Sequence, residues 1–151
     1  MSTPLIIKND IEINASTDKV WDVLVNPEQT KKYMHGCALV SDWKVGSPVL
    51  WNAVWEGKET TFVKGNLLAI TPEKHLAYTT IDAMGSTEDI PANYATVTYS
   101  LEGDGYQTVL LVTQGDYSHI VNGEQKYKEA TEQGGWQSIL EEIKKIAEES
   151  N

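Results

Sequence analysis

Residues 134–146, GGWQSILEEIKKI, decide how the fold is interpreted. Apolar residues in and just after this stretch recur at intervals of three and four, the spacing that places side chains on one face of an α-helix. They are Trp136, Ile139, Leu140, Ile143, Ile146 and Ala147. The stretch therefore predicts one amphipathic C-terminal helix. Upstream, Asn122 is expected to cap this last helix, with Gln125 three residues later.

The chain begins with the pattern of one strand and two short helices. Residues 5–13 alternate apolar and polar side chains, which is typical of a half-buried strand. Ser16 or Thr17 is expected to cap a first short helix. A second short helix is expected after Asn26 and Pro27, because these residues suit the N-cap and the first helical position.

Strand patterns dominate the middle of the chain and predict an antiparallel sheet of about six to seven strands. Asp104 and Gly105 favour a tight turn between the last two strands. Strands that follow one another in sequence commonly pair, and the helices are expected to gather on one face, which gives an α+β fold. A sheet curved around the C-terminal helix can enclose an apolar cavity. Such a cavity predicts the binding of a small hydrophobic molecule, lipid-like or aromatic.

The size and charge of the chain limit the other possibilities. Its 151 residues suit one domain, residues 1–151, with a full core. The net charge of -10 argues against nucleic acid and against anionic membranes as partners, because both require a positive surface. No apolar run is long enough to span a bilayer. With a single cysteine, Cys37, and no signal-peptide pattern, the chain is expected to be cytoplasmic.

No cluster of residues predicts a metal, a cofactor or a catalytic constellation. Asp116, Ser118 and His119 are close in sequence, but a strand end points neighbouring side chains apart, so no triad is expected there. The histidines lack metal-ligand spacing. We therefore expect a binding protein more than an enzyme. An enzyme would need an ionisable group facing the cavity, for which Tyr78, Tyr99 and His75 are the candidates.

Six segments resemble, in order, the Bet v 1/START-like (SRPBCC) superfamily, in the branch named after the C-terminal domain of the activator of Hsp90 ATPase. The resemblance extends from Ile11 to Ile146. Its segments are ASTDKVWDVL at 15–24, DWKVGSP at 42–48, GNLLAITP at 65–72, LAYT at 76–79, TVLLVT at 108–113 and GW with Leu140 and Ile143 in the last helix. The chain differs from the family pattern at Tyr33 and Thr80, where Trp is common, and at Gln107, where Gly is common.

The resemblance implies a helix-grip fold, in which a curved antiparallel sheet holds the C-terminal helix with a cavity between them. Members typically bind lipophilic ligands, and some relatives are cyclases or aromatases. The resemblance implies no fixed catalytic residues. The family name also suggests a chaperone-associated role, although we do not expect this chain to stimulate Hsp90.

Nine residues are candidates for ligand contact. Period-two alternation in the third strand places Val49, Trp51, Ala53 and Trp55 on the inner face. The end of the second helix is expected to lie at the mouth. The candidates are Tyr33, Met34, Trp51, Trp55, Leu67, Tyr78, Tyr99, Trp136 and Leu140. For the tryptophans, simple filling of the core is the alternative interpretation.

Gly134 and Gly135 are unusual inside a predicted helix. Each glycine costs about 1 kcal/mol relative to alanine in a helix interior. Close packing against another backbone or a bend would explain the pair, and room for a ligand is a third explanation. Gly135→Leu is therefore expected to unfold the domain or close the cavity.

Overall fold

The sheet confirms the predicted topology. The computed structural model describes residues 4–85 and 87–149. Within these residues seven strands form one antiparallel sheet in the order β1-β7-β6-β5-β4-β3-β2. The strands are β1 Ile7–Ile13, β2 Ala38–Val40, β3 Pro48–Trp55, β4 Lys58–Thr71, β5 His75–Asp82, β6 Ala95–Gly103 and β7 Thr108–Gly115.

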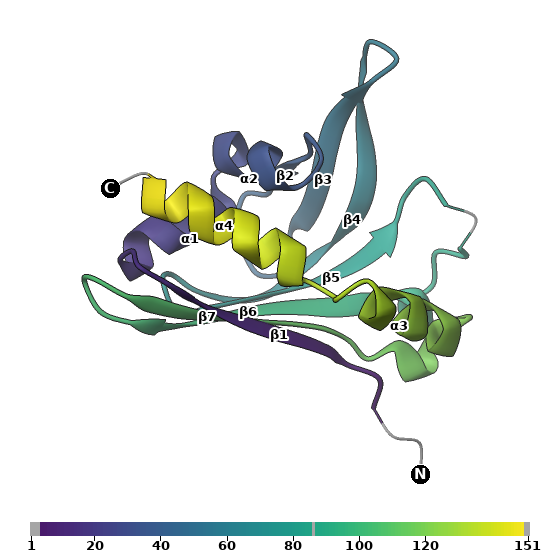
Figure 1. The fold of residues 1–151 in the computed structure, drawn as a ribbon. Coiled ribbons are helices and arrows are strands. Elements are labelled where there is room, and N and C mark those ends of the chain that lie inside the picture. The colour runs from purple at the N-terminus through teal and green to yellow at the C-terminus, as the bar shows by residue number, and fades with distance from the viewer. Residues whose placement is uncertain (1–3, 86, 150–151) are drawn as a thin grey trace.

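The helices lie on the concave side of this sheet. Two short helices, α1 Thr17–Val25 and α2 Pro27–Tyr33, follow β1, and two more, α3 Gly123–Glu132 and α4 Gln137–Glu149, end the chain. The short 3-10 turns are η1 Pro91–Asn93 and η2 Tyr117–His119. Figure 1 shows the long β3–β4 hairpin rising beyond α4, so the sheet curves around that helix. The architecture is the expected α+β helix grip.

Local sequence signals explain how the two short helices begin. The Asn26 side chain accepts a hydrogen bond from the Glu28 backbone N–H at 3.0 Å, and Pro27 occupies the first turn of α2, as predicted. Ser16 occupies the N-cap of α1 but makes no capping hydrogen bond. Its hydroxyl donates to the Asp18 carboxylate instead.

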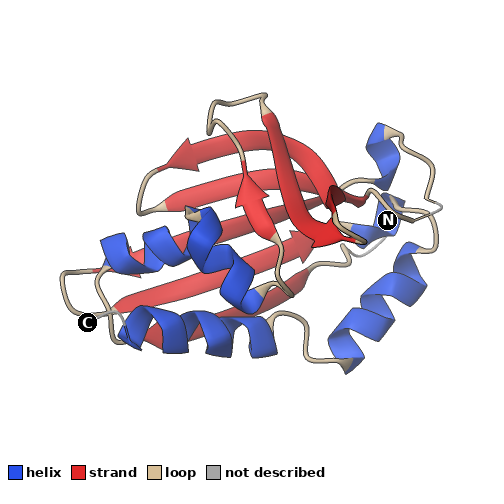
Figure 2. Ribbon diagram, turned by 90° about the horizontal axis from the view of Figure 1, so that it is seen from above, coloured by secondary structure: helices blue, strands red, loops and turns tan. Residues whose placement is uncertain are grey.

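The prediction of one continuous C-terminal helix is wrong. Gly134 and Gly135 have φ of +89° and +61°, which takes the backbone out of the right-handed helix. The chain therefore bends between α3 and α4, as Figure 2 shows. The cap predicted at Asn122 is also wrong, because this residue precedes α3 in a left-handed conformation and its side chain makes no capping hydrogen bond.

Close packing explains the second glycine of the bend. A Cβ atom on Gly135 would lie 2.5 Å from Asn9 Oδ1 and 2.8 Å from Ile7 Cγ2, both on β1. The Asn9 side chain also accepts a hydrogen bond from the Trp136 backbone N–H at 3.0 Å. Of the explanations open from sequence, the structure supports close packing and a bend.

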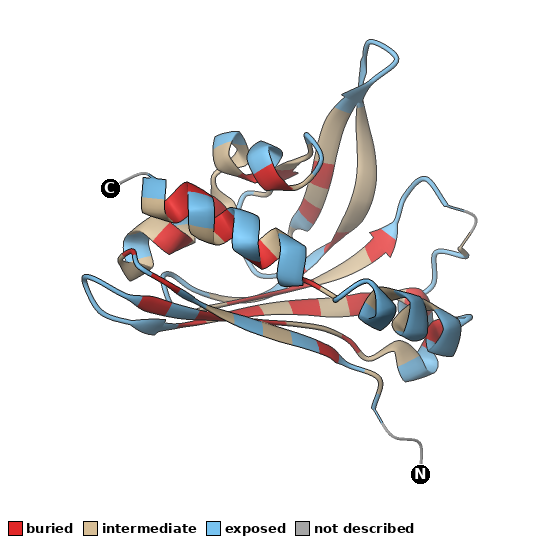
Figure 3. Cartoon of the chain, in the orientation of Figure 1, coloured by how far each residue is buried: buried red, intermediate tan, exposed pale blue. Residues whose placement is uncertain are grey.

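Helix α4 provides the centre of the core. Its buried residues are Leu140, Ile143, Ile146 and Ala147. Figure 3 shows buried residues along α4 and the strands, whereas the tip of the β3–β4 hairpin is exposed. The apolar spacing of the sequence thus predicts correctly which face of α4 packs on the sheet.

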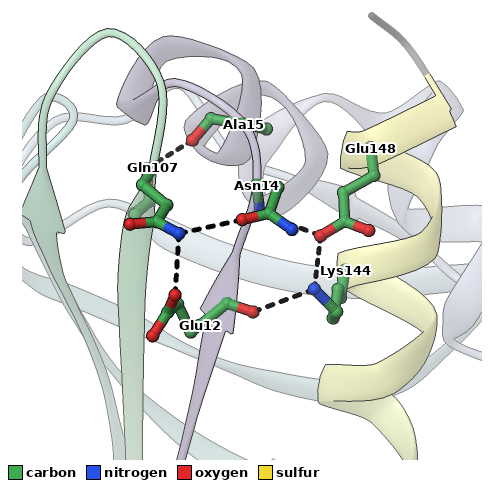
Figure 4. A network of polar contacts seen from close by, with 7 residues as sticks. Glu12, Asn14, Ala15, Gln107, Lys144 and Glu148 are labelled. Carbon is green, nitrogen blue, oxygen red and sulfur yellow. Dashed lines mark hydrogen bonds and ion pairs between the residues drawn. The ribbon is translucent and has the colours of Figure 1, made fainter.

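A polar network fixes the C-terminal end of α4 to the ends of β1 and β7 (Figure 4). Lys144 forms an ion pair with Glu148 and donates to the Glu12 carbonyl at 3.1 Å. Glu148 also accepts from the Asn14 backbone N–H at 2.8 Å. Gln107 donates to Glu12 Oε1 and to Asn14 Oδ1.

Candidate ligand-binding cavity

The domain contains a cavity of about 910 Å³ between the concave face of the sheet and the α3–α4 region. Strands β3 to β7 supply about half of the residues of its wall, and α3 and the glycine bend supply the helical side. From α4 itself only Ile139 lines it. The cavity therefore lies mainly against α3 and the bend, not along α4 as the sequence predicted.

Five of the nine predicted contact residues line this cavity. They are Met34, Trp51, Trp55, Tyr78 and Trp136. Trp51, Tyr78 and Trp136 are almost fully buried, so their rings form the inner part of the wall. Met34 follows α2, where the mouth was expected.

The Trp55 side chain does not face inward, although the strand alternation predicts that it does. Its side chain lies at the rim and is 54% exposed, next to Val54, which is 75% exposed. The β3–β4 hairpin extends past the helices, so no helix lies over the end of β3 (Figure 1). The Trp55 ring packs edge-on against Phe62 of β4, with ring centroids 6.0 Å apart.

The other four predicted residues are buried but do not line the cavity. They are Tyr33, Leu67, Tyr99 and Leu140. The Tyr33 hydroxyl donates to the Val23 carbonyl at 2.9 Å and so joins α2 to α1. Leu140 lies beyond the bend, where α4 is already packed against the sheet.

Aromatic contacts connect the cavity wall to the core. Tyr99 packs edge-on against both Tyr78 and Trp136, with centroids 5.9 Å apart in each case. The Tyr78 and Tyr99 hydroxyl oxygens are 2.8 Å apart. The Trp136 indole N–H donates to Gln114 Oε1 at 2.8 Å. These contacts hold the aromatic wall in a fixed arrangement.

Burial keeps the tyrosine hydroxyls protonated. It raises the pKa of Tyr78 well above its ordinary value, although interactions with Tyr99 and Trp51 act in the opposite direction. Burial likewise raises the pKa of Tyr33 and of Tyr99. Near neutral pH these groups donate hydrogen bonds and do not act as bases.

The structure offers little for the catalytic alternatives. His75 and Tyr99 do not line the cavity, so of the three sequence candidates only Tyr78 does. Burial raises the pKa of the Cys37 thiol at the cavity mouth, which disfavours the reactive thiolate. Among residues 4–85 and 87–149, no three histidine, cysteine, aspartate or glutamate side chains form a metal-binding group.

The sequence prediction missed several lining residues. They include Phe62, Gln114, Lys126 and Ala130. Gln114 could have been found, because period-two alternation in β7 places it on the same face as the buried Leu110 and Val112. Lys126 and Ala130 could not, because the sequence pattern predicts one C-terminal helix and does not separate α3 from it.

The described part of the chain contains no helix long and apolar enough to cross a membrane. The longest helical segment, α4, has 13 residues and is strongly charged on its outer side.

Comparisons with known structures agree with this architecture. A Cytophaga hutchinsonii protein, ChR145, known from its solution structure, is 33% identical, with 99% of this chain and 98% of that chain covered and a TM-score of 0.73. The crystal structure of MLL2253 from Mesorhizobium loti is 20% identical, with 97% and 98% covered and a TM-score of 0.71.

A more distant similarity is to a protein described as an HSP90 activator. This Plasmodium falciparum protein is 15% identical, with 74% of this chain and 72% of that chain covered and a TM-score of 0.57, so the similarity concerns the fold alone. No curated protein matches the chain. The model of the activator of Hsp90 ATPase homolog 1-like proteins matches residues 14–148, and the chain belongs to this family.

Proposed function

We propose that the protein binds a small hydrophobic molecule, lipid-like or aromatic, in the cavity. The observation that supports this proposal is a cavity of about 910 Å³ walled by buried Trp51, Tyr78 and Trp136. Protein interiors are normally close-packed, and ligand pockets commonly measure about 300–1,000 Å³. Affinity would come mainly from removing apolar ligand surface from water, at about 25 cal/mol per Å².

The opening near Trp55 provides a route of entry. Val54 and Trp55 are exposed at the rim, and His35 and Cys37 lie in the segment after α2 that also lines the cavity. A ligand can therefore reach the buried aromatic wall without separation of α4 from the sheet.

Isothermal titration of a panel of fatty acids, terpenoids and naphthalene derivatives tests the proposal. Ala130→Trp adds a large side chain to the cavity wall from α3, and we expect it to weaken binding at least tenfold. Gln125→Trp is the matched control, because it makes the same addition on an exposed position of α3. Absence of binding to the wild-type protein, or equal affinity in the two variants, would contradict the proposal.

A second candidate is an interaction with an Hsp90-like chaperone, which the family match supports. The exposed Val54 and Trp55 would then contact protein instead of guiding a ligand. An Hsp90 ATPase assay tests this role, and we expect no stimulation. A cyclase or hydrolase reaction in the same cavity is a third candidate, for which Tyr78 would have to transfer a proton despite its raised pKa.

We further propose a cytoplasmic location and no nucleic-acid or membrane partner. The net charge of -10 supports the second point, since it opposes contact with polyanions. Fractionation of the native host would test the location.

A further inference from the structure

We infer that the ligand carries a neutral carbonyl oxygen, as in a ketone or ester, and that the Tyr78 hydroxyl donates a hydrogen bond to it. The inference rests on the proposed function, because it names the chemical class that the same cavity selects. It follows from counting the protons and acceptors at the buried wall.

Tyr78 and Tyr99 together have two hydroxyl protons but only one hydrogen bond between them. Their oxygens are 2.8 Å apart, so one hydroxyl donates and the other accepts. Tyr99 is fully buried and does not line the cavity, whereas Tyr78 does. If Tyr99 is the donor, both its proton and the Tyr78 oxygen are satisfied, and the proton that remains belongs to Tyr78, the residue of the pair that lines the cavity.

The opposite arrangement would leave the Tyr99 proton inside the packed core. No described residue other than Tyr78 accepts a hydrogen bond from the Tyr99 hydroxyl. A buried donor without an acceptor is unfavourable, because it loses its hydrogen bond to water and gains none in the protein. The Trp51 side chain also interacts with the Tyr78 hydroxyl, and an indole N–H can only donate. The Tyr78 oxygen therefore already accepts from protein groups, whereas no described residue accepts the Tyr78 proton.

Gln114 adds a second donor on the same wall. Tyr78 pairs with Val97, and Val97 pairs with Gln114, so the three residues form one row across β5, β6 and β7. Strand spacing puts Tyr78 and Gln114 about 10 Å apart. The Gln114 carbonyl accepts from Trp136, and no described residue accepts from its amide N–H groups.

Two other polar residues of the lining, Asn93 and Asp82, are already engaged by protein groups. Both ends of the Asn93 amide are engaged, by the Val121 N–H and by the Glu88 carbonyl. Asp82 is exposed and already accepts from the Met84 N–H. The buried wall thus offers donors, which matches a ligand acceptor. A carboxylate is less suitable next to Tyr78, because Lys126, the lysine that lines the cavity, lies on α3 and not on the strand wall, and burial of an unpaired charge is costly.

Two compounds of nearly the same shape test the inference: 2-acetylnaphthalene, which has a carbonyl, and 2-ethylnaphthalene, which does not. Their affinities are measured by isothermal titration for the wild type, Tyr78→Phe and Tyr99→Phe. We expect Tyr78→Phe to weaken the ketone roughly tenfold and to change the hydrocarbon less than twofold. Tyr99→Phe is the matched control, because it keeps the Tyr78 proton and should preserve the ketone-to-hydrocarbon ratio.

The outcomes separate this inference from the proposed function. If the hydrocarbon binds but the ratio is the same in wild type and Tyr78→Phe, the inference is wrong and the cavity is a general apolar site. If 2-naphthoate binds wild type more tightly than the ketone, the neutral assignment is wrong. If no compound of either kind binds, the proposed function fails together with the inference. Thermal unfolding of each variant confirms that it is folded before titration.

Discussion

The interior has two halves that differ in packing although one sheet serves both. We call the region beneath α4, with Leu140, Ile143 and Ile146, the packed half, and the cavity beside α3 the open half. In the packed half, apolar side chains of α4 fill the concave face. In the open half, the bend at Gly134 and Gly135 redirects the chain, so α3 covers the sheet without filling the space beneath it. The glycine pair thus sets the boundary between core and cavity.

Gly135→Leu is expected to lower the free energy of unfolding more than the other changes, because it disturbs the bend that separates the packed half from the open half. The new side chain would overlap Asn9 and Ile7 of β1 at a backbone φ of +61°. Overpacking and strain each cost about 1–3 kcal/mol, so we expect a loss of about 3–5 kcal/mol in the free energy of unfolding. Urea denaturation measures it.

Gly134→Ala provides the matched control for that change. Its φ of +89° also disfavours a side chain, but the nearest atom to an added Cβ is 3.8 Å away. We expect a loss of about 1 kcal/mol from backbone strain alone. Equal losses in the two variants would mean that contact with β1 does not explain the bend.

Truncations on α4 compare the halves directly. Leu140→Ala leaves a void in the packed half and should cost about 3 kcal/mol of unfolding free energy. Its neighbour Ile139 is partly exposed and lines the existing cavity, so Ile139→Ala should cost about 1 kcal/mol. Denaturation curves of both variants test this. A larger loss of unfolding free energy for Ile139→Ala than for Leu140→Ala would contradict the assignment of Leu140 to the packed half and Ile139 to the open half.

Alkaline pH should destabilise the protein through the buried tyrosines. Burial raises the folded-state pKa of Tyr33, Tyr78 and Tyr99, while the unfolded chain ionises near pH 10. The stabilisation is complete below the unfolded pKa and is lost as pH rises from there through the folded pKa. Each group contributes a slope of about 1.4 kcal/mol per pH unit above pH 10.

Urea unfolding between pH 8 and pH 11 measures this slope. Tyr33→Phe should reduce it, because this variant removes one fully buried hydroxyl. The same slope in Tyr33→Phe and wild type would show that burial of Tyr33 does not govern its ionisation.

The packed half was easier to predict from sequence than the open half. Helical spacing identified Leu140 and Ile143 in the packed half, because α4 faces a continuous core there. Period two identified Trp51 and Tyr78 of the cavity wall, because they lie on the inner face of regular strands. The exposure of Trp55 depends on how far the β3–β4 hairpin extends beyond the helices. Strand alternation does not encode that length. The positions of Lys126 and Ala130 depend on the angle between α3 and α4, and a pair of glycines permits a bend without determining its angle.

The smallest expected effect concerns the end of α4 farthest from the bend. Hydrogen bonding from Lys144, and then from the Asn14 N–H, lowers the pKa of Glu148. The stabilisation is therefore present above the unfolded pKa, near 4.5, and is lost as pH falls through the folded value. Because both side chains are about one-third exposed, Glu148→Gln should cost less than about 1 kcal/mol at pH 7.

Urea unfolding of Glu148→Gln and wild type at pH 7 and pH 3 tests this, and the difference should be smaller at pH 3. Ligand affinity should not change, since neither Lys144 nor Glu148 lines the cavity. A variant that lost binding as well would show that the two halves are coupled through α4. Unchanged binding would mean that the network fixes the packed half alone, and that the bend isolates the cavity from changes at the opposite end of the helix.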